Sequence, residues 1–134
     1  MLAGQAQKED YVNEALLMVD GLLHCAIEDE RSTPPTAPVD GQVWLIGTGP
    51  TGAWSGNEGK IAIRQLNQWL FATPRDGVQL LNKATGQRIN RIADSWHAPV
   101  VPAAPSGGSV VDAEARSSLV ALVAALRTAG VLPA

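Results

Sequence analysis

The sequence predicts a mainly β fold of the α+β class: a small antiparallel meander between an N-terminal amphipathic helix and a short C-terminal helix. Apolar residues repeat with helical spacing only near the two ends of the chain. Short, partly alternating apolar runs separated by turn residues fill the middle. The 134 residues are 46% hydrophobic and 17% charged, a composition typical of one globular domain.

The first helix is predicted from Val12 to Ile27, within an N-terminal region of residues 1–30. Apolar residues recur there every three or four positions, and polar residues occupy the other side. Residues 1–31 carry seven acidic side chains against two basic ones. Polar residues in and just before this helix are expected to contact a partner and to anchor the chain: Gln5, Gln7, Lys8, Asn13 and Glu14.

Two proline-rich linkers divide the rest of the chain. Residues 31–41 and 98–111 are predicted linkers, and residues 42–97 are predicted to form the β-domain. Five short runs predict a meander of four or five strands: QVWLI, KIAIR, QWLFA, VQLLN and QRINRIA. A closing helix is expected over residues 112–130, with Asp112 as its N-cap and Gly130 just past its end.

Both helices carry a seam of apolar residues that predicts self-association. The spacing alternates between four and three residues, as in a coiled coil. Each helix has more apolar surface than a free monomer should expose, so a homo-oligomer, and specifically a trimer, is expected. The residues expected at the oligomer interface are Val12, Leu16, Val19, Leu23, Leu119, Leu122 and Leu126.

The spacing Gly47-x-Gly49-x-x-Gly52 resembles a dinucleotide-binding fingerprint, but its context argues against one. A Rossmann turn needs a helix directly after the glycines, within a βαβ unit. Here Gly56 and Gly59 disfavour a helix, and the next element has the pattern of a strand. The segment is predicted to be a long glycine-rich hairpin loop, and no cofactor is expected.

The sequence offers no catalytic or metal-binding set. Cys25 is the single cysteine, so an internal disulfide is impossible, and the two histidines lie in no catalytic or metal motif. Six bases spread over residues 40–97 do not form a nucleic-acid patch, and no apolar run approaches a membrane span. We therefore expect no enzyme, no nucleic acid and no membrane.

Four tryptophans stand out in so small a chain. Trp44 and Trp69 fall inside predicted strands and are expected in the core. Trp54 lies in the glycine-rich loop, where it either caps the open end of the sheet or, with Asn57, contacts a glycan. The second possibility would make the chain a carbohydrate-binding module for adsorption to a host cell.

Three stretches of the sequence resemble an uncharacterised domain family: AGQAQKEDYVNEALLMVDGL, GQVWLIGTGPTGAWSGNEGKIA and QWLFATPRDG. Members of this family occur in virion proteins of tailed bacteriophages and in gene transfer agents. The resemblance covers residues 2–96 and implies a non-enzymatic virion component, such as a head spike, head fibre or tail fibre part. The chain is then expected in the virion, beside other virion proteins and with a host glycan as a further partner. It is expected to be made in the host cytoplasm, since its N-terminus lacks a signal peptide pattern.

Overall fold

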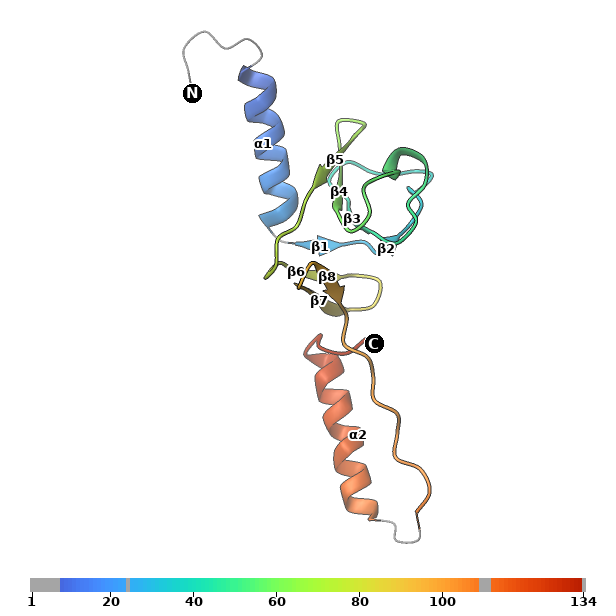
Figure 1. Ribbon diagram of the computed structural model, residues 1–134. Helices are drawn as coiled ribbons and strands as arrows, with labels where there is room; N and C mark the ends of the chain where they lie inside the picture. Colours follow the sequence, from blue (N-terminus) through green and yellow to red (C-terminus); the bar gives the residue numbers. More distant parts are fainter. Residues whose placement is uncertain (1–7, 24, 109–111, 134) are drawn as a thin grey trace. The chain divides into compact units, whose positions relative to one another are not determined.

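A computed structural model describes residues 8–23, 25–108 and 112–133 (Figure 1). The chain forms two compact units, which meet in sequence at Pro74 and Arg75. The described residues hold eight strands in two sheets, an N-terminal helix and a C-terminal helix, so the predicted mainly β fold of the α+β class is confirmed. Neither described helix has the length and apolar character needed to cross a membrane.

The first unit begins with a helix and continues as a four-stranded sheet. Its elements are α1 (Lys8–Leu23), β1 (Ala26–Ile27), β2 (Glu30–Arg31), β3 (Val43–Ile46), the 3-10 turn η1 (Gly52–Trp54), β4 (Ile61–Gln65) and β5 (Gln68–Ala72). The sheet has the order β2-β3-β4-β5. β3, β4 and β5 pair antiparallel, as the meander predicts, whereas β2 pairs parallel with β3.

The start of this unit differs from the sequence prediction. The helix ends at Leu23, and Ala26 and Ile27 form a short strand in place of its last turn. Ile27 is fully buried, and the chain just after it hydrogen-bonds to β3, from the N–H of Glu28 to the carbonyl of Val43. Apolar residues at these two positions fit a helix stripe and a buried strand equally well, and the complete burial of Ile27 together with the hydrogen bond from Glu28 decides for the strand.

One face of this sheet carries an aromatic core. Trp44, Ile46, Trp54 and Ala62 form a buried cluster against which Trp69 and Phe71 pack. The ring centres of Trp54 and Trp69 are 5.1 Å apart in an edge-to-face arrangement, which is favourable for aromatic pairs. The prediction that Trp44 and Trp69 belong to the core is confirmed. The opposite face buries the apolar residues Val43, Leu45, Ile61 and Ile63.

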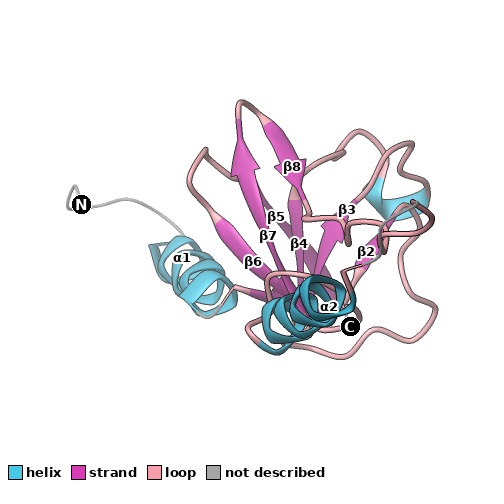
Figure 2. Cartoon of the chain, turned by 90° about the horizontal axis from the view of Figure 1, so that it is seen from below, coloured by secondary structure: helices cyan, strands magenta, loops and turns pink. Residues whose placement is uncertain are grey.

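The second unit contains β6 (Gln79–Asn82), β7 (Gln87–Ile92), β8 (Ser95–His97) and α2 (Ala113–Thr128). The three strands lie side by side and antiparallel (Figure 2). Residues alternate in β6, with Leu80 and Asn82 buried and Gln79 and Leu81 exposed. β8 was not predicted, because it is short and lies next to the predicted linker.

Local chemistry fixes both ends of α2. The Asp112 carboxylate accepts the N–H of Ala115 at 2.8 Å, which confirms the predicted N-cap. Gly130 has φ +69°, and its N–H donates to the carbonyl of Arg127 at 2.9 Å, as expected for a glycine after a helix. Its own carbonyl accepts the N–H of Arg88 at 2.7 Å, so the end of α2 is attached to β7. No described side chain of α2 is buried.

The two units share a three-stranded frame. In each, an Asp-Gly pair precedes three antiparallel strands, and the last two strands meet at a tight turn. An arginine just before this turn lies over a tryptophan just after it: Arg64 is 5.3 Å from the ring centre of Trp69, and Arg91 is 5.6 Å from that of Trp96. The repeated contact indicates that the second unit repeats the architecture of the first.

Candidate functional site

α1 turns the more polar of its two sides toward the sheet of its own unit. Leu17 and Gly21 are half-buried and, with Val43 and Ile63, line a small pocket of about 140 Å³. A Cβ placed on Gly21 would lie 2.7 Å from Ile63 Cδ1, so the glycine lets the helix approach β4 closely. No residue of α1 is buried. An ordinary amphipathic surface helix buries its apolar stripe, and α1 does the reverse.

A groove of about 320 Å³ separates the N-terminal half of α1 from the β4–β5 hairpin. Two carboxylates, three amides and three leucines line it: Asp10, Asn13, Glu14 and Leu17 from α1, and Gln65, Leu66, Gln68 and Leu70 from the hairpin. Among the described residues, the five polar side chains of this lining have no hydrogen bond or ion pair, and no basic residue contributes to it. The groove is therefore acidic, and its polar groups are available to a ligand.

The tip of the β4–β5 hairpin is held rigidly at one side of the groove. Leu66 and Asn67 both have positive φ, +47° and +60°, a conformation that costs a leucine more than an asparagine. The carboxylate of Asp40 accepts the N–H of Leu66 at 3.0 Å and that of Asn67 at 3.3 Å. The guanidinium of Arg64 donates to Asn67 Oδ1 at 3.1 Å. These contacts fix a turn whose Leu66 side chain is 68% exposed.

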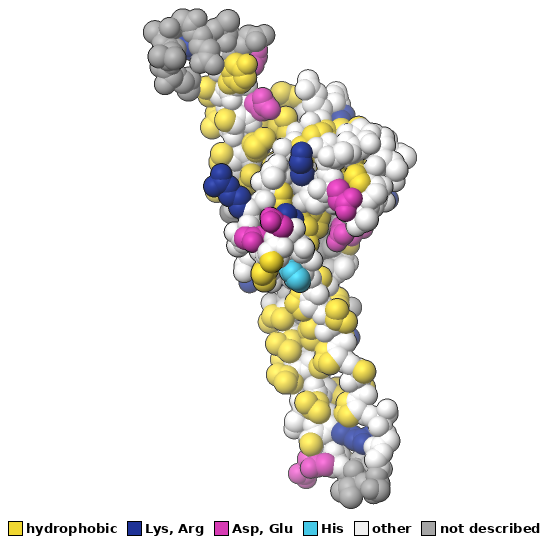
Figure 3. Space-filling model, in the orientation of Figure 1, with side chains coloured by type: hydrophobic (Ala, Val, Ile, Leu, Met, Phe, Trp, Pro, Cys, Tyr) yellow, Lys and Arg dark blue, Asp and Glu magenta, His cyan; other side chains and the backbone are white. Residues whose placement is uncertain are grey.

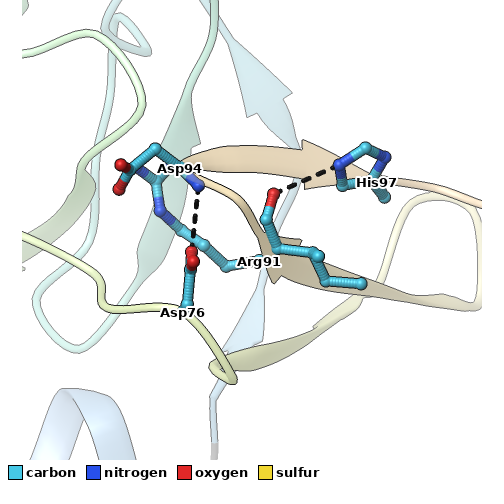
Figure 4. Close-up of polar contacts among 5 residues, drawn as sticks. Asp76, Arg91, Asp94 and His97 are labelled. Atoms are coloured by element: carbon cyan, nitrogen blue, oxygen red, sulfur yellow. Dashed lines mark hydrogen bonds and ion pairs between the residues drawn. The ribbon is translucent and has the colours of Figure 1, made fainter.

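The second unit fixes its β7–β8 turn in the same manner (Figure 4). Ala93 and Asp94 have φ +50° and +59°, and the carboxylate of Asp76 accepts the N–H of Asp94 at 3.0 Å. The guanidinium of Arg91 lies 3.6 Å from the Asp94 carboxylate. The position that corresponds to Leu66 holds Ala93, so this type of turn does not itself need a large apolar side chain.

The sequence predicted only those residues of the groove that belong to α1. Of the predicted docking residues, Asn13 and Glu14 line the groove, and Lys8 is the first residue of α1. Gln5 and Gln7 lie outside the described residues. The hairpin residues were not predicted. Leu66-Asn67 between two strands was nevertheless a usable signal, because a two-residue hairpin turn requires positive φ, which disfavours leucine.

The predicted oligomer interface is largely exposed. In α1, Leu16, Val19 and Leu23 are 60%, 57% and 68% exposed, and Val12 is half-buried. In α2, Leu119 and Leu122 are 49% and 55% exposed, and Leu126 is half-buried. Apolar side chains cover much of the visible face of α2 (Figure 3). Each helix therefore presents an apolar seam that its own unit leaves uncovered.

The prediction of a glycan contact at Trp54 is wrong. Trp54 is fully buried, in contact with Trp44 and Trp69, so neither face of its ring can stack on a sugar. The other predicted contact, Asn57, is half-buried and bonded within its own loop: its amide donates to the carbonyl of Ser55, and its Oδ1 accepts from Lys60 Nζ. A small domain gains more from burying a large aromatic side chain than from exposing it.

The glycine-rich segment is a hairpin loop, as predicted. Gly47–Gly59 connects β3 with β4, which are antiparallel neighbours, and a Rossmann crossover joins parallel strands. The segment contains a single 3-10 turn, Gly52–Trp54, in place of the helix that would hold a pyrophosphate.

Cys25 lies in an environment that disfavours the thiolate. Burial raises the pKa of the Cys25 thiol, which makes it a weaker nucleophile at neutral pH. His97 is exposed, and its Nε2 is 3.3 Å from the carbonyl oxygen of Ile92. No cluster of three or more metal-ligating side chains occurs within the described residues.

The structure is that of a mainly β domain that carries an N-terminal helix with an acidic groove beside it. A model of the family described as protein of unknown function (DUF2793) matches residues 12–97, from inside α1 to the last residue of β8. The match covers more than half of the chain, so the protein belongs to this family. A search of curated proteins finds no match. The resemblance to an uncharacterised domain family is confirmed to this extent.

Proposed function

We propose that the protein is a non-enzymatic structural component of a phage virion or phage-like particle, in the class of head spikes, head fibres and tail fibres. One observation carries the proposal: α1 exposes its apolar seam and turns polar residues to its own sheet. Exposed apolar area of this kind is unfavourable for a free monomer and is normal in a subunit of an assembly. The sequence resemblance to virion proteins supplies the particle context.

The subunit associates with copies of itself through the two helices, as a trimer. In α1 the spacing assigns Leu16 and Leu23 to one core position of the heptad and Val12 and Val19 to the other. Leucine at position a with a β-branched residue at position d favours more than two strands. Burying one leucine contributes about 1.5–3 kcal/mol. Several such residues from each copy can outweigh an association cost of about 4–15 kcal/mol.

In the assembled particle, residues 1–30 anchor the chain, and the β-structure points outward. The acidic N-terminal region suits a basic site on the particle. Residues 31–41, predicted as a linker, are instead held against the sheet of the first unit: Arg31 belongs to β2, the N–H of Thr51 donates to the carbonyl of Ser32, and Asp40 holds the β4–β5 turn. Other virion proteins at the docking site are therefore the second class of partner. The exposed Asp10 and Glu14 of α1 support this orientation, since they have no basic partner among the described residues.

Sedimentation of the full chain tests the assembly. Leu16→Asp and Leu119→Asp place a charge in the two seams and should convert a trimer into monomers. Val120→Asp is the matched control, because Val120 is 63% exposed on α2 but lies outside the seam. If the unmodified chain sediments as a monomer at micromolar concentration, the proposed oligomer is wrong.

Purified particles test the location. Antibody labelling should detect the chain on particles, and deletion of residues 1–10 should lower its occupancy on them. Full occupancy of the truncated chain would assign the anchor to another part of the protein, and absence of the intact chain from particles would overturn the proposed function.

A further inference from the structure

We propose that the groove between α1 and the β4–β5 hairpin binds a segment of a partner protein that carries a lysine or arginine next to an aliphatic side chain. The inference deepens the proposed function, and it rests on that function for the origin of the segment, another protein of the particle. It names the chemistry by which the partner is recognised.

Charge is the first argument. Asp10 and Glu14 are four residues apart on α1, and both line the groove. Like charges at this spacing destabilise a helix, and no base in the lining offsets them. A lysine or arginine side chain placed between the two carboxylates would remove this repulsion. The amides of Asn13, Gln65 and Gln68 line the same groove and can bond the backbone of the bound segment.

The apolar part of the lining is the second argument. Leu66 is 68% exposed in a backbone conformation with φ +47°. Asparagine or glycine would satisfy the turn better, and the corresponding position of the second unit holds Ala93. The turn therefore gains nothing from the leucine. Leu17 and Leu70 are half-buried in the same groove, so an aliphatic side chain of the partner would contact three leucines.

The groove wall is also preorganised. Asp40 holds the N–H groups of Leu66 and Asn67, and Arg64 holds the Asn67 side chain. A wall that is already fixed loses little conformational entropy when a ligand binds, which leaves more of the contact energy for affinity.

A partner protein fits the groove better than a second copy of this chain. The exposed seam residues Leu16, Val19 and Leu23 are absent from the groove lining, so copies that pack along the seam leave the groove open. A bare cation would leave the three leucines uncovered. A protein segment can satisfy the carboxylates, the amides and the leucines together.

The test begins with a positional-scanning library of synthetic peptides of about ten residues, a length that spans a groove of this kind. The probe for the library is the purified full chain. Binding should select lysine or arginine with leucine, isoleucine or valine one to three positions away. The selected peptide is then titrated against variants at two salt concentrations. No selection over a scrambled peptide would overturn the proposal.

The variants separate docking from folding. Asp10→Asn and Glu14→Gln should each weaken binding about tenfold and reduce its salt dependence. Glu9→Gln is the matched control: it removes the same charge one residue away, from a side chain that does not line the groove, and should leave affinity unchanged. Leu66→Asn should raise stability while weakening binding about fivefold, a pair of effects that a purely structural leucine would not give.

Three results overturn the proposal. The first is that Glu9→Gln weakens binding as much as Glu14→Gln does. The second is that Leu66→Asn leaves the affinity unchanged. The third is that Glu14→Gln dissociates the oligomer, which would assign the groove to a second copy. Measuring whether the chain is present on purified particles separates the proposed virion role from the proposed binding in the groove. If the chain is found on particles but selects no peptide, the groove proposal alone is wrong. If it selects the peptide but is absent from particles, the virion role alone is wrong.

Discussion

Gly21 of α1 lies so close to Ile63 of β4 that a Cβ on the glycine would come within 2.7 Å of Ile63 Cδ1 and 3.1 Å of two further carbons of that side chain. This approach places the backbone of α1 directly against β4. Alanine at this position favours the helix by about 0.8–1 kcal/mol, whereas overpacking against a buried isoleucine costs about 1–3 kcal/mol.

We therefore expect Gly21→Ala to lower stability and the hydrogen-exchange protection of α1. Ile63→Val removes Cδ1, the atom in the tightest contact, so Gly21→Ala should become neutral or stabilising in that background. Chemical denaturation of the two single variants and the double variant measures the coupling. If Gly21→Ala stabilises the unmodified protein, α1 does not pack at this point.

The two carboxylate-clamped turns give a paired prediction. Asp40→Ala and Asp76→Ala should each lower the free energy of unfolding by about 1 kcal/mol, because each removes a carboxylate that accepts backbone N–H groups of an exposed turn, two at Asp40 and one at Asp76. Glu14→Gln serves as the comparison: its carboxylate accepts no such hydrogen bond among the described residues, so this change should not lower stability. Equal stability of all three variants would show that the clamps contribute nothing.

Trp54 should behave as a core residue. Trp54→Ala should cost about 3–5 kcal/mol of stability, the usual range for a buried tryptophan. Its Nε1–H is buried and finds no hydrogen-bond partner in the described structure. Trp54→Phe should therefore lower stability much less than Trp54→Ala does. The phenyl ring keeps part of the packing, and the loss of the unpaired N–H removes its desolvation penalty. Thermal unfolding followed by near-UV circular dichroism checks both variants, and near-native stability of Trp54→Ala would exclude a core role.

Cys25 provides a pH-dependent prediction. Burial raises the pKa of its thiol, so the folded state holds the proton more tightly than the unfolded state. Its contribution to stability is fully present below the pKa of the unfolded chain and is lost as the pH rises through the raised folded pKa. Alkylation by iodoacetamide should have its pH midpoint at a higher value in native than in denatured protein. Identical midpoints would contradict burial of the thiol, and Cys25→Ser controls for other sites.

Local signals in the sequence predicted most of the secondary structure. Alternating runs gave the five longer strands, and Asp112 and Gly130 marked the ends of α2 through capping chemistry. The strands β1 and β2 could not be predicted, because a strand of two residues is defined by its hydrogen bonds to segments that are distant in sequence. The frame repeated in the second unit was detectable: Asp-Gly recurs at Asp40 and Asp76, and Arg-x-x-Asn/Asp-x-Trp recurs from Arg64 and Arg91.

The candidate site was only half predictable for a physical reason. Helical periodicity shows which side of α1 is apolar, but it does not show which side meets the sheet. The approach of Gly21 to Ile63 settles that question, and it turns Asp10, Asn13 and Glu14 toward the β4–β5 hairpin. The sequence therefore predicted that Asn13 and Glu14 face a partner, but not that the β4–β5 hairpin forms the other wall of their site.

The shared frame also shows where this architecture accepts extra chain. The two frames share three antiparallel strands and a clamped turn, yet the first connection differs greatly in length: residues 47–60 in one unit and residues 83–86 in the other. The longer connection folds back to bury Trp54, while in the shorter one the N–H of Gly86 bonds to the carbonyl of Asn82. Loop closure becomes only slowly more costly with length. The Lys83–Gly86 turn is therefore a natural insertion point, where a foreign epitope or binding peptide could be displayed while the strands around it keep their register.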